Sequence, residues 1–200
     1  MTTTRRSLLT MASLAPLYSI SAESLARPLT YADRDRLVLS DFGGEQPFIM
    51  PGARWRGFTD RVMGGVSDAD FGASVVAGRR CARMAGTVTR DSGGGFIQMA
   101  MYLDNFSAAE FSGIELFVYG NDEDYNLHIR TADCGWHDES YRATFRAESR
   151  WQTIRLPWEK FTPNSVAAPL DTSNLQRIGL LGWMRDFQAD LAISEVAFYS

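Results

Sequence analysis

The residues with the richest chemistry in the sequence lie close together, between positions 55 and 68. This stretch reads W-R-G-F-T-D-R-V-M-G-G-V-S-D and combines aromatic, acidic, basic and hydroxyl side chains with two adjacent glycines. An indole can stack on a ligand, while a carboxylate, a guanidinium and a hydroxyl supply directed hydrogen bonds. One interpretation of the stretch is therefore a recognition loop, whose candidate binding residues are Trp55, Asp60, Arg61, Met63, Gly64, Gly65 and Ser67.

A structural corner is the second interpretation of the same residues. Short polar side chains such as Asp60 and Ser67 bind nearby backbone groups and so stabilise turns. The pair Gly64 and Gly65 favours backbone that turns through positive φ or approaches another group closely. The aromatic residues would then close one end of a β-sandwich. The sequence leaves both interpretations open.

A second candidate surface comes from residues 124–131 and 141–146, where alternating apolar residues predict two strands. The outward positions of these strands are Asn126, His128, Arg130, Arg142, Thr144 and Arg146. If the two strands share a sheet, these residues form one polar, arginine-rich face. Arginine pairs with carboxylates and stacks on aromatic rings, so the face suits a protein or a carbohydrate partner. An ordinary solvated sheet face is the alternative.

The sequence contains no motif that is typical of a catalytic site or of a cofactor-binding site. His128 and His137 are the only histidines, and no G-x-S-x-G nucleophile elbow accompanies them. The glycines at 64–65 and 93–95 lack the following helix and the lysine of a phosphate-binding loop. The sequence carries no dinucleotide-binding fingerprint either. We therefore expect a protein that is not an enzyme and has no cofactor.

Two clusters could hold a metal ion, but each has a simpler explanation. Residues 133–139 read D-C-G-W-H-D-E, which offers ligands for a soft or borderline metal or forms the polar tip of a hairpin. Residues 121–124 read N-D-E-D, which offers oxygen ligands for calcium or forms a solvated turn. We favour the hairpin tip and the turn, and predict no metal site.

The two cysteines, Cys81 and Cys134, are too few and too far apart for a zinc knuckle. In an oxidising compartment they could form a disulfide, which would stabilise the fold by about 4 kcal/mol. Two unpaired buried thiols are the alternative.

The N-terminus predicts export from the cytoplasm. Arg5 and Arg6 are followed by a short, weakly apolar run and by small residues that end at Ala26, as in a twin-arginine signal peptide cleaved after Ala26. The run is shorter than the ~20 residues that a membrane-spanning helix needs. We therefore predict a periplasmic protein without a membrane span in the mature chain. A mitochondrial transit peptide is the alternative, because the segment is rich in arginine and hydroxyl residues.

The elements that must position these residues are β-strands. From residue 37 onward, short apolar or alternating runs are separated by Gly, Asn, Asp and Pro, with almost no amphipathic helix pattern. The runs are residues 36–42, 80–88, 97–103, 113–119, 124–131, 141–146, 151–156, 173–183 and 190–199. About eight to ten such strands predict an all-β, antiparallel β-sandwich or barrel.

Domain organisation follows from the same pattern: a signal peptide at 1–26, a polar lead-in at 27–36 and one β-sandwich domain at 37–200. Residues 105–111 and 158–161 are each predicted to form a single helical turn. A shift in apolar phase between Ile193 and Val196 predicts a β-bulge near Ser194 and Glu195. The chain has 20 Lys and Arg against 24 Asp and Glu, which excludes a basic nucleic-acid-binding domain.

Five segments, taken in order along the chain, resemble one known family. They are W-x-x-x-x-D-R-V-M-G-G-V-S at 55–67, G-G-F at 94–96, S-G-I-E-L at 112–116, S-Y-R-A-T-F at 140–145 and W-Q-T-I-R-L-P-W-E-K-F-T-P at 151–163. Together they resemble the complex I intermediate-associated protein family, whose eukaryotic members help to assemble the mitochondrial NADH:ubiquinone oxidoreductase. The resemblance covers about residues 37–199.

The resemblance implies a galactose-binding-like β-sandwich jelly roll with a chaperone-like binding or assembly role and no catalysis. The implied partner is a protein, such as a subunit of a respiratory or envelope redox complex. A periplasmic carbohydrate-binding module is the alternative from a different class, with Trp55, Trp136 or Trp183 as stacking platforms. Two features differ from the family: the export-type leader, and residues 164–168, which lack the Arg-Gly pair expected of relatives.

Overall fold

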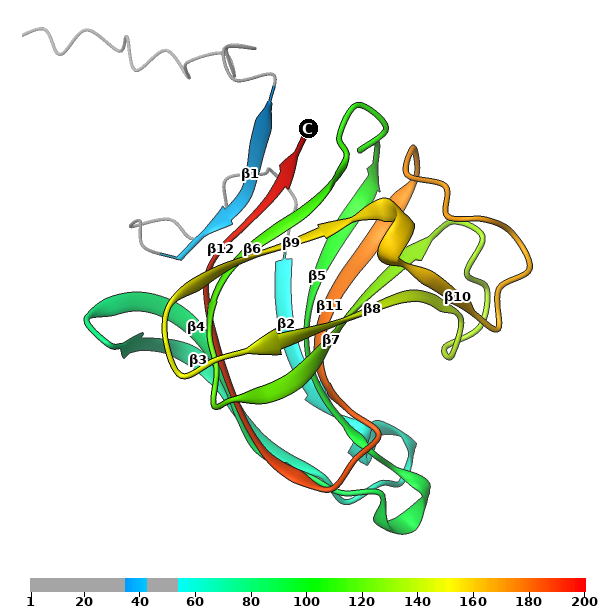
Figure 1. The fold of residues 1–200 in the computed structure, drawn as a ribbon. Helices are drawn as coiled ribbons and strands as arrows, with labels where there is room; N and C mark the ends of the chain where they lie inside the picture. Colours follow the sequence, from blue (N-terminus) through cyan, green and yellow to red (C-terminus); the bar gives the residue numbers. More distant parts are fainter. Residues whose placement is uncertain (1–34, 43–53) are drawn as a thin grey trace, which may run out of the picture. The chain divides into compact units, whose positions relative to one another are not determined.

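Twelve β-strands and three short 3-10 helices make up the part of the chain that the structure, a computed structural model, describes (Figure 1): residues 35–42 and 54–200. The strands are β1 Arg36–Asp41, β2 Arg54–Thr59, β3 Asp68–Val76, β4 Arg79–Val88, β5 Phe96–Phe106, β6 Gly113–Tyr119, β7 Glu123–Thr131, β8 Ser140–Ala147, β9 Gln152–Pro157, β10 Thr162–Asn164, β11 Leu175–Trp183 and β12 Phe187–Tyr199. The 3-10 helices are η1 Asp60–Met63, η2 Asp91–Gly93 and η3 Trp158–Lys160.

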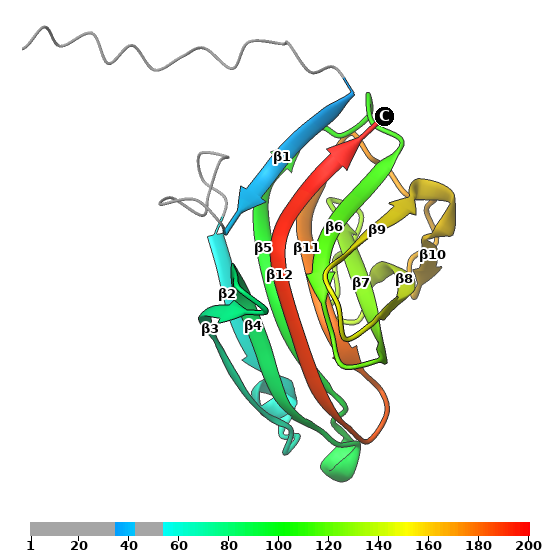
Figure 2. The ribbon, with the colours of Figure 1, turned by 60° about the vertical axis from the view of Figure 1, so that its left-hand side comes forward.

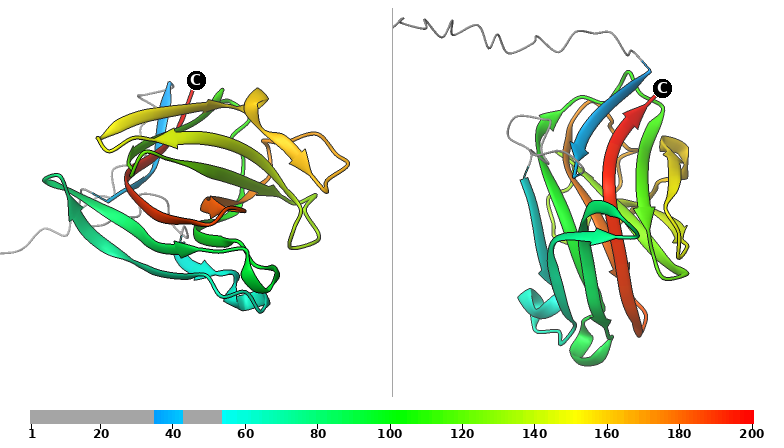
Figure 3. Two further views of the ribbon diagram at one scale, coloured as in Figure 1. Left: turned by 60° about the horizontal axis from the view of Figure 1, so that its bottom comes forward. Right: turned by 90° about the vertical axis from the view of Figure 1, so that its left-hand side faces the viewer.

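The strands form two antiparallel sheets of six strands each. In the first sheet the order is β3-β4-β12-β6-β9, and β1 also pairs with β12. In the second sheet the order is β10-β8-β7-β11-β5-β2. Figure 2 shows β1, β12 and β6 in front of β5 and β11, and Figure 3 shows the same two layers from two further directions. The predicted all-β, antiparallel β-sandwich is confirmed.

Strand β12 connects the first sheet, because two different strands pair along one of its edges. Its first half pairs with β4, and its second half pairs with β1 in the register Tyr199 to Arg36. Strand β6 pairs along the opposite edge, and the register shifts between Ile193 and Glu195. This shift confirms the predicted bulge.

The core lies between the sheets and comes from the alternation of the strands. Tyr125, Leu127 and Ile129 of β7 are fully buried, and so is Leu116 on β6, which lies between β12 and β9 in the other sheet. Burying one such side chain contributes about 1.5–3 kcal/mol of hydrophobic free energy.

The nine predicted strands all occur, and three further strands were not predicted: β2, β3 and β10. The helical turn predicted at 158–161 is confirmed as η3. The helical turn predicted at 105–111 is wrong. Strand β5 continues to Phe106, where it still pairs with Leu175 of β11, and no helix follows it.

Several predictions fall on residues outside the described ranges. These are the signal peptide at 1–26, its cleavage after Ala26, and all of the lead-in except residues 35 and 36. The described residues belong to one unit, Asp33–Ser200. Within residues 35–42 and 54–200, no helix has the length and apolar character needed to cross a bilayer.

The candidate disulfide between Cys81 and Cys134 is absent. Cys81 lies in β4 of the first sheet, Cys134 follows β7 of the second sheet, and both are buried free thiols. Burial raises the pKa of the Cys81 thiol, so it stays protonated at neutral pH. The alternative of two buried thiols is what the structure has.

Candidate functional site

Asp60 is the structural centre of the stretch that the sequence singled out. It begins η1 and is fully buried, at 0% exposure. Its carboxylate accepts hydrogen bonds from the backbone N–H of Ser67, Gly95 and Phe96 and from the Ser67 hydroxyl. Since Gly95 and Phe96 lie just after η2, one carboxylate fastens two distant segments together at one end of the sandwich.

Three glycines are required by this arrangement. A Cβ at Gly65 would lie 2.4 Å from the Asp60 Cγ, and a Cβ at Gly94 would lie 2.3 Å from its Oδ2. Gly64 has a φ of 91°, in the left-handed region that glycine adopts without strain. The D-R-V-M-G-G-V-S and G-G-F sequences therefore describe the two sides of one carboxylate-binding corner.

The electrostatics of Asp60 follow from the same contacts. Burial by itself raises the pKa of the Asp60 carboxyl, but the hydrogen bonds from Ser67, Gly95 and Phe96 outweigh burial and hold the pKa below its usual value. The group is therefore ionised at neutral pH.

Most of the predicted recognition loop is structural. Trp55 lies half-buried in β2, where its indole Nε1 donates to the Ser40 hydroxyl at 3.1 Å and its ring packs against Phe42. It is therefore placed for packing and not for stacking on a ligand. Arg61 donates to the carbonyl of Ser67 and pairs with Asp68. Of the seven loop candidates, only Met63 combines high exposure, at 58%, with a place at the groove described next.

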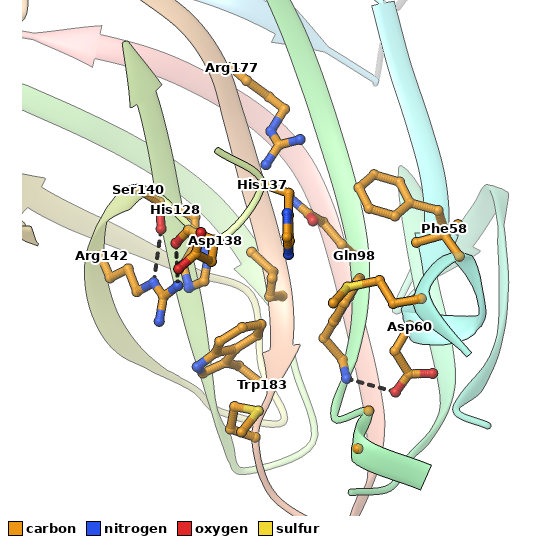
Figure 4. Close-up of a pocket in the computed structure, with 17 residues that line it drawn as sticks. Phe58, Asp60, Gln98, His128, His137, Asp138, Ser140, Arg142, Arg177 and Trp183 are labelled. Atoms are coloured by element: carbon orange, nitrogen blue, oxygen red, sulfur yellow. Dashed lines mark hydrogen bonds between the residues drawn. The ribbon is translucent and has the colours of Figure 1, made fainter. Parts of the chain in front are cut away.

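A groove of about 490 Å³ runs over the outer face of the second sheet (Figure 4). Its lining includes Phe58 of β2, Gln98 of β5, His128 of β7, Arg142 of β8, and Arg177 and Trp183 of β11. Figure 4 shows His128, Arg142 and Trp183 on one side of the groove, and Phe58 and Asp60 on the other. The groove thus draws on five strands that are far apart in sequence.

Strand register explains how these residues meet. Phe58 pairs with Gln98 across β2 and β5, and Gln98 pairs with Leu181 of β11. In the neighbouring row, His128 pairs with Gly179 on one side and with Arg142 on the other. A Cβ at Gly179 would lie 2.0 Å from the Gln98 Nε2, so glycine at this position makes room for the amide.

The floor of the groove carries two buried polar atoms without partners. Gln98 is 3% exposed and His128 is 5% exposed, and the Nε2 atom of each has no hydrogen-bond partner in the described chain. Burial, and after it the charges of Arg142 and Arg177, lowers the pKa of His128 to about 3. The imidazole is therefore neutral at physiological pH.

Trp183 is held between other groups. The Arg142 guanidinium carbon lies 4.7 Å from the centre of the Trp183 ring, in cation–π geometry. The His128 ring meets the indole edge-on with the centroids 4.9 Å apart, and the Phe96 ring lies 6.0 Å away. These contacts fix the orientation of Trp183 and cover much of its surface.

The predicted arginine-rich face is only partly available for binding. Strands β7 and β8 do pair, but Arg130 donates to the carbonyls of Cys134, Trp136 and Glu139 and so supports the loop that follows β7. Other members of the face bind one another or a neighbour: Asn126 accepts from Thr144, and Arg146 pairs with Asp124. His128 and Arg142 are the members that line the groove.

The two metal alternatives have no support in the described residues. No group of three or more His, Cys, Asp or Glu side chains converges there in a way that could hold an ion. Residues 133–139 form the loop that Arg130 supports, with Trp136 72% exposed. At the other cluster, the Asp122 carboxylate binds the backbone N–H and the hydroxyl of Ser149.

Comparison with family profiles identifies one family, and comparison with solved structures finds proteins of the same fold. The sequence profile of the complex I intermediate-associated protein 30 family matches residues 41–191. No curated protein matches the chain in sequence.

Several solved structures share the fold. The family 11 carbohydrate-binding module of a cellulosomal cellulase of Clostridium thermocellum superposes with a TM-score of 0.66 at 14% identity, over 82% of this chain and 94% of that chain. A family 11 module from Clostridium thermocellum in complex with a β-1,3-1,4-mixed-linked tetrasaccharide gives 0.64 at 13% identity, over 83% and 96%. A family 30 module from a cellulosomal cellulase of the same organism gives 0.58 at 10% identity, over 82% and 97%. These similarities agree with the predicted antiparallel β-sandwich fold.

Proposed function

The chain belongs to the complex I intermediate-associated protein 30 family, and from this premise we propose a non-catalytic binding protein that acts in assembly. Its groove holds a protein partner during the assembly of a respiratory or envelope redox complex. The family supports an assembly-related role, and the groove supplies the place where a partner would bind.

The observation that carries this proposal is the pair of unpartnered polar atoms on the groove floor. A buried donor or acceptor without a partner costs about 1–3 kcal/mol, and native proteins retain few of them. Gln98 and His128 both have such an atom, and both line the same groove. A bound ligand that supplies hydrogen bonds to these atoms would remove that cost.

The apolar rim of the groove favours a protein over a sugar. Val62, Met63 and Met184 line it and are 69%, 58% and 50% exposed. Methionine adapts its shape to apolar partners and is used at protein-binding surfaces. A sugar ring would instead need an open aromatic face, and the Arg142 guanidinium already lies over the ring of Trp183.

The proposal of a non-catalytic role also has support from His128. A general base at neutral pH needs a pKa near 7 and a hydrogen bond that orients it. His128 has a pKa of about 3, and its Nε2 is without a partner in the described chain. This histidine is therefore suited to binding as a neutral group.

A photo-cross-linking experiment in the source organism tests the assembly role. The photoreactive residue p-benzoylphenylalanine replaces Met63 on the groove rim or, as a matched control, Val75 of β3 in the first sheet, which is 66% exposed. We expect a subunit of a redox complex, identified by mass spectrometry, among the products at position 63 and not at position 75. The proposal would be contradicted if positions 63 and 75 gave the same cross-linked products, or if position 63 gave none.

The same experiment tests the proposed location. We propose that the twin-arginine leader exports the protein, so the cross-linked product should be recovered from the periplasmic fraction. Recovery of an unprocessed product from the cytoplasm, or from mitochondria if the source cell has them, would contradict export.

Carbohydrate binding is the second candidate, and the solved folds favour it. One similar module is described with a mixed-linked tetrasaccharide, and Trp136 of this chain is 72% exposed next to His137 and Asp138 of the groove. If this candidate is right, the β-1,3-1,4-mixed-linked tetrasaccharide should quench tryptophan fluorescence, and Trp136→Ala should abolish the change. Fluorescence that stays constant at millimolar sugar would remove this candidate.

A further inference from the structure

Two arginines that line the groove, Arg142 and Arg177, differ from more than half of the arginines of the described chain because they have no carboxylate partner there. Ion pairs with carboxylates hold eight arginines of the described chain: Arg36, Arg61, Arg83, Arg90, Arg146, Arg150, Arg155 and Arg185. Arg142 and Arg177 form no ion pair there, although both line the groove and both are half-buried. A half-buried guanidinium without a carboxylate retains much of its capacity to bind one.

The carboxylates of the groove lining are already engaged. Asp60 accepts four hydrogen bonds from Ser67, Gly95 and Phe96. Asp138 is exposed and hydrogen-bonds the Ser165 side chain, and its carboxylate attracts Arg142 only at longer range. The lining therefore presents more donors and positive charge than acceptors.

We propose that the groove recognises a carboxylate of the partner polypeptide, bound by Arg142 and Arg177 over the amide of Gln98 and the imidazole of His128; this inference rests on the proposed function. The carboxylate belongs either to an acidic side chain or to the end of the partner chain. Apolar residues beside it would contact Phe58, Met63 and Met184 on the rim.

Arg142 is oriented in advance for this role. Its Nε donates to the Ser140 hydroxyl at 2.9 Å and its Nη2 to the Asp138 carbonyl at 3.0 Å, while Trp183 supports the guanidinium plane. These bonds use Nε and Nη2 and leave Nη1 for a ligand. A preoriented guanidinium loses less conformational entropy on binding than a mobile one.

The surroundings of Arg177 differ from those of Arg142, but they also favour binding of a carboxylate. Arg177 hydrogen-bonds the Tyr102 side chain, its guanidinium carbon lies 6.0 Å from the centre of that ring, and the nearby charge of Arg130 repels it. Burial, and after it this repulsion, lowers the pKa of Arg177. A bound carboxylate would offset both the burial and the repulsion, which a neutral ligand could not do.

The test uses three peptides that differ only in their carboxylates. The first is an acetylated and amidated hexapeptide with a central glutamate flanked by leucine and phenylalanine, and the second replaces glutamate with glutamine. The third is the glutamine peptide with a free C-terminal carboxylate. Binding to the ¹⁵N-labelled full chain is measured by NMR, from the side-chain amide of Gln98 and the indole N–H of Trp183. The glutamate peptide and the free-end peptide represent the two sources of the carboxylate.

We expect at least one carboxylate peptide to shift the Gln98 and Trp183 signals and to bind at least about tenfold more tightly than the neutral peptide, because charge-assisted hydrogen bonds are the stronger ones. Arg177→Gln, alone and combined with Arg142→Gln, should remove this preference. Arg80→Gln is the matched control, since Arg80 is an exposed residue of β4 in the other sheet, and it should leave the preference unchanged.

Two outcomes would overturn the inference: equal binding of all three peptides, or binding of none of them at millimolar concentration. The cross-link at position 63 does not depend on these peptides, so its presence would leave the assembly role standing when the carboxylate inference fails. If a carboxylate peptide binds but no protein is cross-linked at position 63, the assembly role is contradicted, and the groove binds an acid that does not belong to a protein partner.

Discussion

Replacing Asp60 with asparagine should lower the free energy of unfolding by about 3 kcal/mol, the sum expected when a buried carboxylate loses its match to several donors. Asparagine has nearly the same shape, but one acceptor oxygen becomes an N–H₂ donor. That donor would face Ser67 or the N–H of Gly95 and Phe96, which now donate to the carboxylate. Urea unfolding followed by circular dichroism measures the change.

Asp68→Asn is the matched control for this substitution. Asp68 lies eight positions further along the chain, its side chain is 76% exposed, and it forms an exposed ion pair with Arg61. Exposed ion pairs contribute little, so this variant should unfold close to the wild-type midpoint. Equal stability of Asp60→Asn and Asp68→Asn would show that the buried corner does not hold the fold.

The Asp60 corner also positions one side of the groove. Strand β2 carries Phe58 and leads directly into η1, which carries Met63, and the carboxylate fastens this segment to Gly95 and Phe96. Different residues of this short motif therefore stabilise the fold and line the groove. Asp60 and Ser67 are turned inward to hold the corner, and Met63 is turned outward to the groove.

The strands were predictable where one face is buried and the other is polar. Strands β7 and β8 show this alternation clearly, so their bounds and their outward residues could be read from the sequence. Strand β2 could not be predicted in this way, because it has apolar residues on both faces. Trp55 lies on the face toward the core and Phe58 on the face toward the groove, so apolar and polar residues do not alternate. Strand β3 lies at the edge of the first sheet with most of its residues exposed, so its apolar signal is weak.

The groove was predictable only in part, for a related reason. His128 and Arg142 lie on strands that are neighbours in sequence and in space, so alternation alone places them together. Gln98 and Arg177 join them only because β11 lies between β5 and β7, an order that no local pattern encodes. The role of Asp60 needed the structure as well, since its N–H donors at Gly95 and Phe96 are 35 and 36 positions away.

Because of His128, lowering the pH should destabilise the wild-type protein at pH values well above those at which carboxylates titrate. Its pKa is about 3 in the fold and about 6.5 in the unfolded chain, so below pH 6.5 the unfolded state binds a proton that the folded state does not. The stability contributed by the neutral imidazole is complete above pH 6.5 and falls as the pH decreases toward 3. Between pH 7 and pH 4.5 the expected loss is about 2.5 kcal/mol, measured by urea unfolding at each pH.

His128→Gln isolates this contribution, because glutamine fills a similar volume and does not titrate. Asp60 does not interfere: its pKa is lowered in the fold, so its contribution is lost only below the unfolded value of about 3.9. The variant should therefore lose about 2.5 kcal/mol less than the wild type over the same pH interval. Parallel curves for the wild type and His128→Gln would mean that the imidazole can be protonated in the fold, and that the groove floor is open to water.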